Sequence, residues 1–176
     1  MATVSIRPTA VKYGLILGGI LAVYSVVLGM TGNTSNQTLG YLSYAIGIAG
    51  VALACLEFRK LQGYMTFGQG FQTGFLTFLI ASLISSAVGA AHMAIDPAIG
   101  EEALEMARQQ MESDPRVTPE ALEMGMGWAK TMMQPGMIFV FGLVGGAIGG
   151  ALIGLITAAI LKRDPAPGAD MDEIGG

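Results

Sequence analysis

Hydrophobic residues in this chain gather into four long runs that are separated by more polar segments. The runs cover residues 12–30, 38–58, 70–95 and 135–161. A helix needs about 20 apolar residues to cross a hydrocarbon core of about 30 Å, and each run meets that length. Between the end residues of these runs, the only formally charged side chain is Glu57. The pattern predicts four membrane spans, which must be helices because lipid offers no partners to backbone polar groups.

The first run also resembles the apolar part of a secretory signal peptide. A signal peptide has an apolar core of about 7–15 residues followed by a cleavage site with small residues. The run here is longer, and no A-x-A pattern follows Met30. We therefore expect it to be retained as the first transmembrane helix.

The segment between the third and fourth runs, residues 96–134, has a helical pattern of its own. Asp-Pro at 96–97 and Thr-Pro at 118–119 are typical helix starts, and Asp-Pro at 114–115 separates them. Apolar residues recur at helical spacing at Leu104, Ala107, Met111, Leu122, Met126, Ala129 and Met133. We expect an amphipathic helical hairpin that lies over the outer ends of the spans, with Trp128 at the level of the lipid headgroups.

The composition agrees with a membrane protein. Hydrophobic residues make up 52% of the chain and charged residues 12%, against about 25% charged in soluble domains. The predicted fold is an all-α integral membrane protein, a four-transmembrane-helix bundle with an amphipathic helical hairpin between helices 3 and 4. Residues 1–163 form the membrane domain, and residues 164–176 form an acidic tail that is predicted to be disordered. The net charge of −4 disfavours nucleic acid as a partner.

Basic residues gather on one side of the predicted spans. Six of the nine lysines and arginines lie there: Arg7, Lys12, Arg59, Lys60, Lys162 and Arg163. The opposite side holds residues 96–134, where eight acidic and three basic residues give a net charge of −5. Because cytoplasmic loops carry an excess of lysine and arginine, we expect both termini in the cytoplasm and the hairpin outside.

Small residues recur every four positions in several runs. The fourth run contains Gly142, Gly146, Gly150 and Gly154, and the first contains Gly14 and Gly18. Glycines at this spacing form a groove that lets another helix backbone approach closely. Three interpretations remain open: packing among the chain's own helices, an interface with another subunit, and a pore lined by glycine backbone.

Few side chains in or near the runs can carry a charge. Glu57 lies beside Arg59 and Lys60, which favours a local salt bridge, with a proton or cation site as the alternative. His92 and Asp96 are four residues apart, so they can meet on one helix face. An interfacial capping pair is the simpler interpretation of these two, and a proton-sensing pair is the alternative.

Hydroxyl groups give the third run a more polar character than the others. They belong to Thr73, Thr77, Ser82, Ser85 and Ser86. We expect these groups to form hydrogen bonds between helices, and a polar stripe for permeation is the alternative.

Chemistry-bearing motifs are scarce. Eight of the twelve methionines fall between Met93 and Met137, which suits either packing on amphipathic helices or Cu(I) binding. The chain has one histidine and one cysteine, and no Walker loop or nucleophile elbow. We expect no enzyme activity, no cofactor and no resident metal site.

Three stretches resemble a known family. They read KYGL at residues 12–15, GYMTFGQGF at 63–71 and GLITAAILKR at 154–163, with a long outer loop before the last. The chain is similar to the bacterial membrane family, found mainly in Bacteroidota, that is catalogued as domain of unknown function 4199. It departs from the family at Gln69, where members often carry a basic residue. The resemblance implies a four-helix inner-membrane protein and transfers no site residues.

The sequence supports three functional hypotheses of different classes. The first is a structural or accessory protein of the inner membrane that packs through its small-residue faces into an oligomer or a larger membrane complex. The second is a small-solute or ion transporter or channel that uses the hydroxyls of the third run, with a wet cavity lined by Thr77 and Ser85. The third is a metal-binding module that uses Met124 and Met126.

Overall fold

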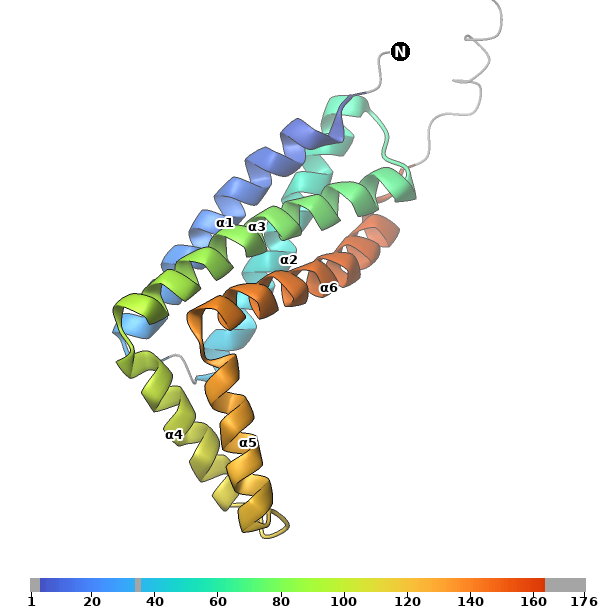
Figure 1. Ribbon diagram of the computed structural model, residues 1–176. Helices are drawn as coiled ribbons and strands as arrows, with labels where there is room; N and C mark the ends of the chain where they lie inside the picture. The colour runs from blue at the N-terminus through green and yellow to red at the C-terminus, as the bar shows by residue number, and fades with distance from the viewer. Residues whose placement is uncertain (1–3, 34–35, 164–176) are drawn as a thin grey trace, which may run out of the picture.

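The computed structural model describes residues 4–33 and 36–163, and all regular elements in this part of the chain are helices. The helices are α1 (Ile6–Met30), α2 (Gln37–Gln62), α3 (Phe67–Ile95), α4 (Ala98–Glu112), α5 (Pro119–Met132) and α6 (Pro135–Leu161) (Figure 1). Four of them, α1, α2, α3 and α6, are long and apolar enough to cross a membrane. The predicted all-α membrane fold is confirmed. The acidic tail at residues 164–176 lies outside the described residues.

Three of the spanning helices, α1, α2 and α3, extend beyond the predicted runs, and in α2 and α3 capping groups mark the new ends. The side chain of Asn36 accepts a hydrogen bond from the Thr38 N–H at the start of α2. Gly63 ends α2 in the left-handed conformation, with φ of 85°, which glycine adopts without strain. Thr66 and Gln69 form a capping box that starts α3.

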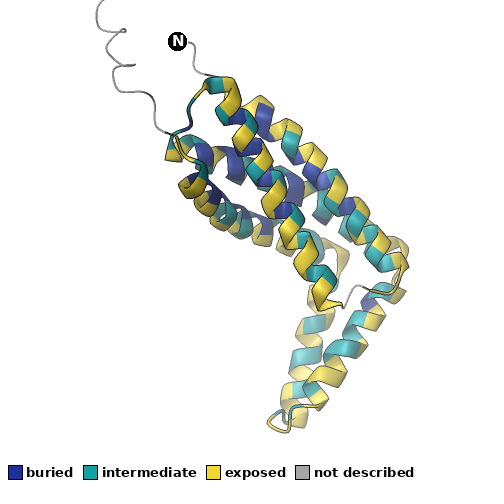
Figure 2. Ribbon diagram, turned by 180° about the vertical axis from the view of Figure 1, so that it is seen from behind, coloured by how far each residue is buried: buried dark blue, intermediate teal, exposed yellow. Residues whose placement is uncertain are grey.

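Helix α3 is the centre of the bundle. It packs most extensively against α6 on one side and α1 on the other, and α2 makes smaller contacts with all three. The core cluster of buried side chains contains Leu17, Val51, Cys55, Phe58, Met65 and Ala81 (Figure 2). The buried residues of α2 all lie between Gly47 and Phe58, so this helix is anchored by its C-terminal half.

The bundle has two distinct ends. The terminal end holds the starts of α1 and α3 and the ends of α2 and α6 (Figure 1). Here Met65 and Arg163 exchange two backbone hydrogen bonds of 2.9 and 2.8 Å, and Arg59 donates to the Leu161 carbonyl at 3.2 Å. These bonds fix the chain after α6 against the loop between α2 and α3.

The hairpin formed by α4 and α5 projects from the other end. Its predicted inward faces are confirmed, because all seven apolar residues that define them are half-buried. Figures 1 and 2 show that the hairpin turns away from the long axis of the bundle. Its main contacts with the spans are those of α4 with α3 and of α5 with α6. The hairpin therefore does not lie over the outer ends of the spans, as we expected. Two short loops, one between α3 and α4 and one between α5 and α6, join it to the bundle at these two helices.

Candidate functional site

The most closely packed surface in the bundle is the seam between α3 and α6. A Cβ atom added at Gly154 would lie 3.2 Å from both the Phe71 carbonyl oxygen and the Phe75 backbone nitrogen. A Cβ atom at Gly150 would lie 3.2 Å from the Phe78 Cβ. At Gly154 the α6 backbone therefore lies so close to the α3 backbone that any larger residue would be crowded.

The hairpin half of this seam is closed by serines. A Cβ atom at Gly142 would meet the Ser86 side chain, and one at Gly146 would meet the Ser82 side chain. Each of the four predicted glycines of α6 thus faces one turn of α3. Both serines are small side chains, which suits this close approach of α6 to α3.

A second seam joins α1 to the opposite side of α3. A Cβ atom at Gly14 would lie 2.7 Å from the Ile80 Cβ, and one at Gly18 would lie 3.1 Å from the Ala81 Cα. Both glycine rows are therefore occupied by α3 of the same chain. Of the three interpretations left open above, packing among the chain's own helices is the one this geometry supports.

The hydroxyl groups of α3 bond within their own helix. Thr73 donates to the Gln69 carbonyl at 2.8 Å, Ser85 to the Ala81 carbonyl at 2.9 Å and Ser86 to the Ser82 carbonyl at 2.6 Å. We expected bonds between helices. The difference arises because the carbonyl one turn earlier is always within reach of a helical serine or threonine.

Thr77 is the exception in this row. Its side chain is completely buried, and its hydroxyl has no hydrogen-bond partner within the described chain. It lies where α1 closes on α3, since the Thr77 carbonyl is 3.0 Å from a Cβ atom built at Gly14. Thr77 therefore does not line a wet cavity in this structure.

A small open crevice, mostly apolar but with three serines in its wall, lies nearer the hairpin end between α1, α2 and α3. It encloses about 350 Å³ and is lined by Leu21, Tyr24, Ser25, Leu28, Gly40, Ser43 and Ser85. Of the two residues expected to line a cavity, it contains only Ser85. We did not predict from the sequence that Ser25 and Ser43 would line a crevice. In the sequence, each is a single polar residue within an apolar run.

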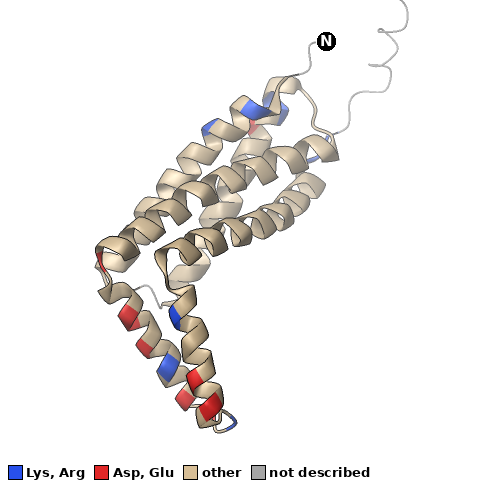
Figure 3. Cartoon of the chain, viewed as in Figure 1, with Lys and Arg blue, Asp and Glu red and all other residues tan. Residues whose placement is uncertain are grey.

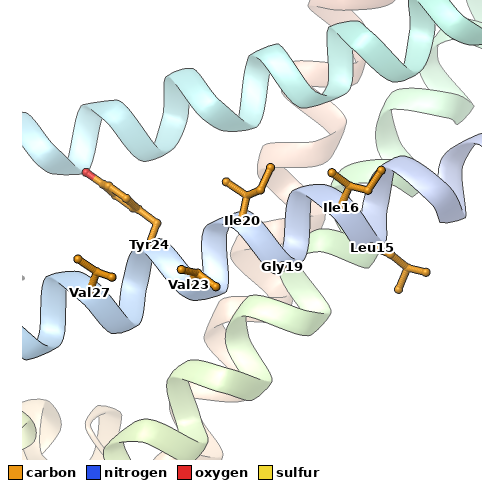
Figure 4. Close-up of a pocket in the computed structure, with 7 residues that line it drawn as sticks. All are labelled: Leu15, Ile16, Gly19, Ile20, Val23, Tyr24 and Val27. Carbon is orange, nitrogen blue, oxygen red and sulfur yellow. The ribbon is translucent and has the colours of Figure 1, made fainter.

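Tyr24 closes the gap between α1 and α2 next to this crevice. Its hydroxyl donates a hydrogen bond of 2.9 Å to the Leu39 carbonyl. Figure 4 shows Tyr24 reaching across to α2 from a face of α1 that is otherwise apolar. Val23 is 65% exposed on this face. The apolar side chains beside Tyr24 suit contact with lipid tails.

The structure places the predicted titratable residues at the two ends of the bundle. The Glu57 carboxylate lies 3.9 Å from the Lys12 ammonium of α1. This salt bridge joins two helices, whereas we expected a partner among the residues next to Glu57. Arg59 turns instead to the end of α6. The partner differs because α1 packs against α2 and brings the exposed Lys12 close to Glu57.

His92 and Asp96 do not form a side-chain pair in the structure. The imidazole of His92 packs against Gly29 of α1, where an added Cβ atom would lie 2.6 Å from its Cε1. The Asp96 carboxylate accepts a hydrogen bond of 3.2 Å from the Ala98 N–H at the start of α4. The capping role expected of Asp96 is present, and His92 serves as a packing residue between α3 and α1.

Methionine sulfurs fill the spaces over glycines in and beside the hairpin. A Cβ atom at Gly125 would lie 2.9 Å from the Met111 sulfur, and one at Gly100 would lie 2.9 Å from the Met93 sulfur. Met124 is 66% exposed. Within residues 4–33 and 36–163, no three acidic, histidine or cysteine side chains cluster closely enough to hold a metal ion.

Comparison with known proteins identifies the family of this chain. A model of the family described as "Protein of unknown function (DUF4199)" matches residues 12–163. The chain belongs to the DUF4199 family. The match begins within α1 and ends two residues after α6, so it includes all four spans and the hairpin. The resemblance noted in the sequence is thereby confirmed.

Searches of curated proteins and of solved structures found no match to this DUF4199 chain. The family description names no activity and no binding residues. The function must therefore be argued from the surfaces that this chain leaves uncovered.

Proposed function

We propose that this DUF4199 protein is a structural or accessory protein of the bacterial inner membrane, which assembles with copies of itself or with other membrane subunits. One observation supports the proposal most directly. Helix α5 carries a row of exposed apolar side chains, spaced four residues apart, that we call the α5 stripe: Met124, Trp128 and Met132, which are 66%, 64% and 42% exposed. No described part of the chain covers them.

The charge of the hairpin favours a protein as the partner of the α5 stripe. Residues 96–134 carry a net charge of −5 (Figure 3). A bilayer surface containing anionic lipids would repel this charge. Tryptophan and methionine are also enriched at the centres of protein interfaces. The proposed assembly therefore uses the α5 stripe and not the glycine rows, which α3 already covers.

Native mass spectrometry of the protein, extracted gently from its own membrane, tests this proposal. We expect the wild-type chain to retain a defined oligomer or another subunit. The double variant Met124→Ala and Trp128→Ala should lose it, because both substitutions remove apolar contact area from the stripe. The exposed residue Glu123 of the same helix provides a control, and Glu123→Ala should keep the assembly. A wild-type chain that is always a lone monomer would contradict the proposal.

The proposed orientation places both termini in the cytoplasm and the hairpin outside. It rests on the basic residues at the terminal end and the acidic hairpin at the other (Figure 3). Arg116 lies exposed at the tip of the hairpin. Trypsin added to intact spheroplasts should therefore cut after Arg116. Cleavage only in inverted membrane vesicles would reverse the orientation.

A second candidate, a transporter or channel for small solutes or ions, draws support from the serines of the small crevice that Ser85 lines. Purified protein in liposomes should then conduct a solute, and Ser85→Val should reduce the flux. Thr77, which is buried against α1, does not contribute to that support. The accessory role is the better supported of the two, because the α5 stripe is an exposed apolar surface that no described part of the chain covers, whereas the wall of the crevice is mostly apolar and offers a solute few polar groups.

A further inference from the structure

The terminal end of the bundle contains a pocket that the proposed function does not use. It encloses about 470 Å³ and lies between the last turns of α2 and Arg163, the second residue after α6. Five residues line it: Leu56, Arg59, Lys60, Gly63 and Arg163. Three of these side chains are cations at neutral pH. We call it the basic pocket.

The positive charge of the basic pocket is not neutralised by the rest of the described chain. The ion pairs among residues 4–33 and 36–163 join Lys12 to Glu57, Arg108 to Glu112 and Arg116 to Asp114, and none includes a cation of the pocket. One guanidinium nitrogen of Arg59 donates to the Leu161 carbonyl. Within the described part of the chain, no other hydrogen bond or ion pair engages the side chains of these three cations, so their remaining donors can face an anion there.

Tertiary structure holds the walls of the basic pocket in place. The pair of backbone hydrogen bonds between Met65 and Arg163 fixes the chain that carries the third cation. Gly63 turns the chain sharply at the end of α2, and its N–H bonds to the Arg59 carbonyl. The cations thus come from the end of α2 and from the chain just after α6, which are about a hundred residues apart in sequence. The hydrogen bond from Arg59 to Leu161 joins the same two distant segments.

The position of the pocket indicates what the anion is. It lies at the ends of two transmembrane helices, where the apolar parts of α2 and α6 give way to basic residues. At this depth a bilayer presents the phosphate groups of its lipids. Leu56, which is 37% exposed, supplies an apolar wall next to the cations. A lipid offers both a phosphate for the cations and an acyl chain for this wall.

We propose that the basic pocket binds the phosphate headgroup of an anionic membrane lipid. Basic pockets between transmembrane helices are known to bind such headgroups. The proposal is independent of the accessory role, because it concerns the opposite end of the molecule from the α5 stripe.

Lipid titration followed by native mass spectrometry tests the proposal on the full chain in mild detergent. The probe is phosphatidylglycerol, and phosphatidylcholine with the same acyl chains is the reference. We expect tighter binding of phosphatidylglycerol to the wild type. Lys60→Gln and Arg163→Gln should each weaken it about five-fold, because a basic residue near an anionic lipid contributes about 1 kcal/mol. Neither change touches the backbone bonds between Met65 and Arg163.

Lys12→Gln is the matched control, since Lys12 lies near the same end but pairs with Glu57 outside the pocket. It should leave phosphatidylglycerol binding within about two-fold of wild type. Equal loss in all three variants would show a general effect of net charge and would overturn the proposal. Equal binding of the two lipids by the wild type would overturn it as well.

Two further measurements separate the lipid from other anions and from a structural role. Millimolar inorganic phosphate should not displace the lipid, because it lacks the acyl chain; full displacement would overturn the assignment to a lipid. Phosphatidylglycerol should also raise the Tm of the wild type more than that of Lys60→Gln. If the cations only stabilise the helix ends, the lipid raises both values equally, which would contradict lipid binding.

Discussion

The four-helix bundle and the hairpin are both made of helices, but they are held together in different ways. In the bundle, glycines bring α6 so close to α3 that a Cβ atom added at Gly154 would lie 3.2 Å from two α3 backbone atoms, and hydroxyls bond within their own helix. In the hairpin, α4 and α5 meet through half-buried leucine, alanine and methionine side chains, with charged residues on the outside (Figure 3). The one part packs backbone on backbone, and the other packs side chain on side chain.

The solvent explains this difference. In lipid, burying an apolar side chain against another helix gains little, because the lipid tails are equally apolar, so association depends on close van der Waals contact between small residues. In water, removing apolar surface from solvent drives association, and large flexible side chains serve well. The same substitution should therefore have different effects in the two regions.

The largest effect is expected at the seam between α3 and α6. Gly154→Leu places a side chain against the Phe71 carbonyl and the Phe75 nitrogen, which are backbone atoms and cannot move aside. We expect a loss of about 3 kcal/mol in the free energy of unfolding, measured by denaturant titration in lipid bicelles. Gly145, on the outer face of α6, has no atom within 4 Å of an added Cβ. Gly145→Leu should cost less than about 0.5 kcal/mol.

Equal destabilisation by these two leucines would mean that the seam is no tighter than the lipid-facing surface. That result would contradict the claim that the bundle depends on close packing at glycines.

The same substitution, Gly→Ala, should have opposite effects on stability in the hairpin and in the bundle. At Gly125 of the hairpin, the new methyl group meets the end of the flexible Met111 side chain, which can move aside. Because alanine favours a helix over glycine by about 0.5–1 kcal/mol, Gly125→Ala should stabilise α5. Gly154→Ala should destabilise the bundle by about 1 kcal/mol through its contacts with backbone. Hydrogen exchange of the α5 amides and bicelle unfolding measure the two effects, and effects of the same sign would contradict the comparison.

A smaller effect concerns two threonines of α3 that differ only in their hydrogen bonds. The Thr77 hydroxyl is buried without a partner in the described chain, whereas the Thr73 hydroxyl bonds to the Gln69 carbonyl. Thr77→Val should raise the free energy of unfolding by about 1 kcal/mol, and Thr73→Val should lower it by about 0.5 kcal/mol. A loss of stability in Thr77→Val would show that this hydroxyl is paired, with water entering the bundle.

The smallest effect is a pH dependence at the tip of the hairpin. Hydrogen bonds from the Arg116 side chain and then from its backbone N–H hold the pKa of Asp114 below its ordinary value. A lowered pKa means that the contribution to hairpin stability is present above the ordinary pKa of aspartate and is lost as the pH falls through the lowered value. Amides at the tip should lose protection against hydrogen exchange, after correction for the intrinsic pH dependence of exchange, as the pH falls through the lowered pKa. Asp114→Asn should remove this dependence, and an unchanged dependence would place its origin elsewhere.

Much of the fold could be predicted from the sequence because lipid and water impose simple patterns on helices. The apolar runs locate α1, α2, α3 and α6, and the start and end of α6 match the prediction. The inward faces of α4 and α5 follow from their helical spacing alone. These features depend on residues near one another in the chain, and so does the turn at Asp114.

Contacts between distant segments could not be predicted, since a small-residue row indicates close packing without naming the helix that fills it. Only the tertiary structure shows that α3 occupies the rows on both α1 and α6, and that Glu57 pairs with Lys12. It also shows that two short links direct the hairpin away from the bundle. The basic pocket combines cations from the ends of α2 and α6, which meet because the chain folds back through Met65 and Arg163. The sequence by itself determined which segments enter the membrane, through the free energy of transferring each one; the tertiary structure decided which surfaces remain free to bind, through the packing of small residues.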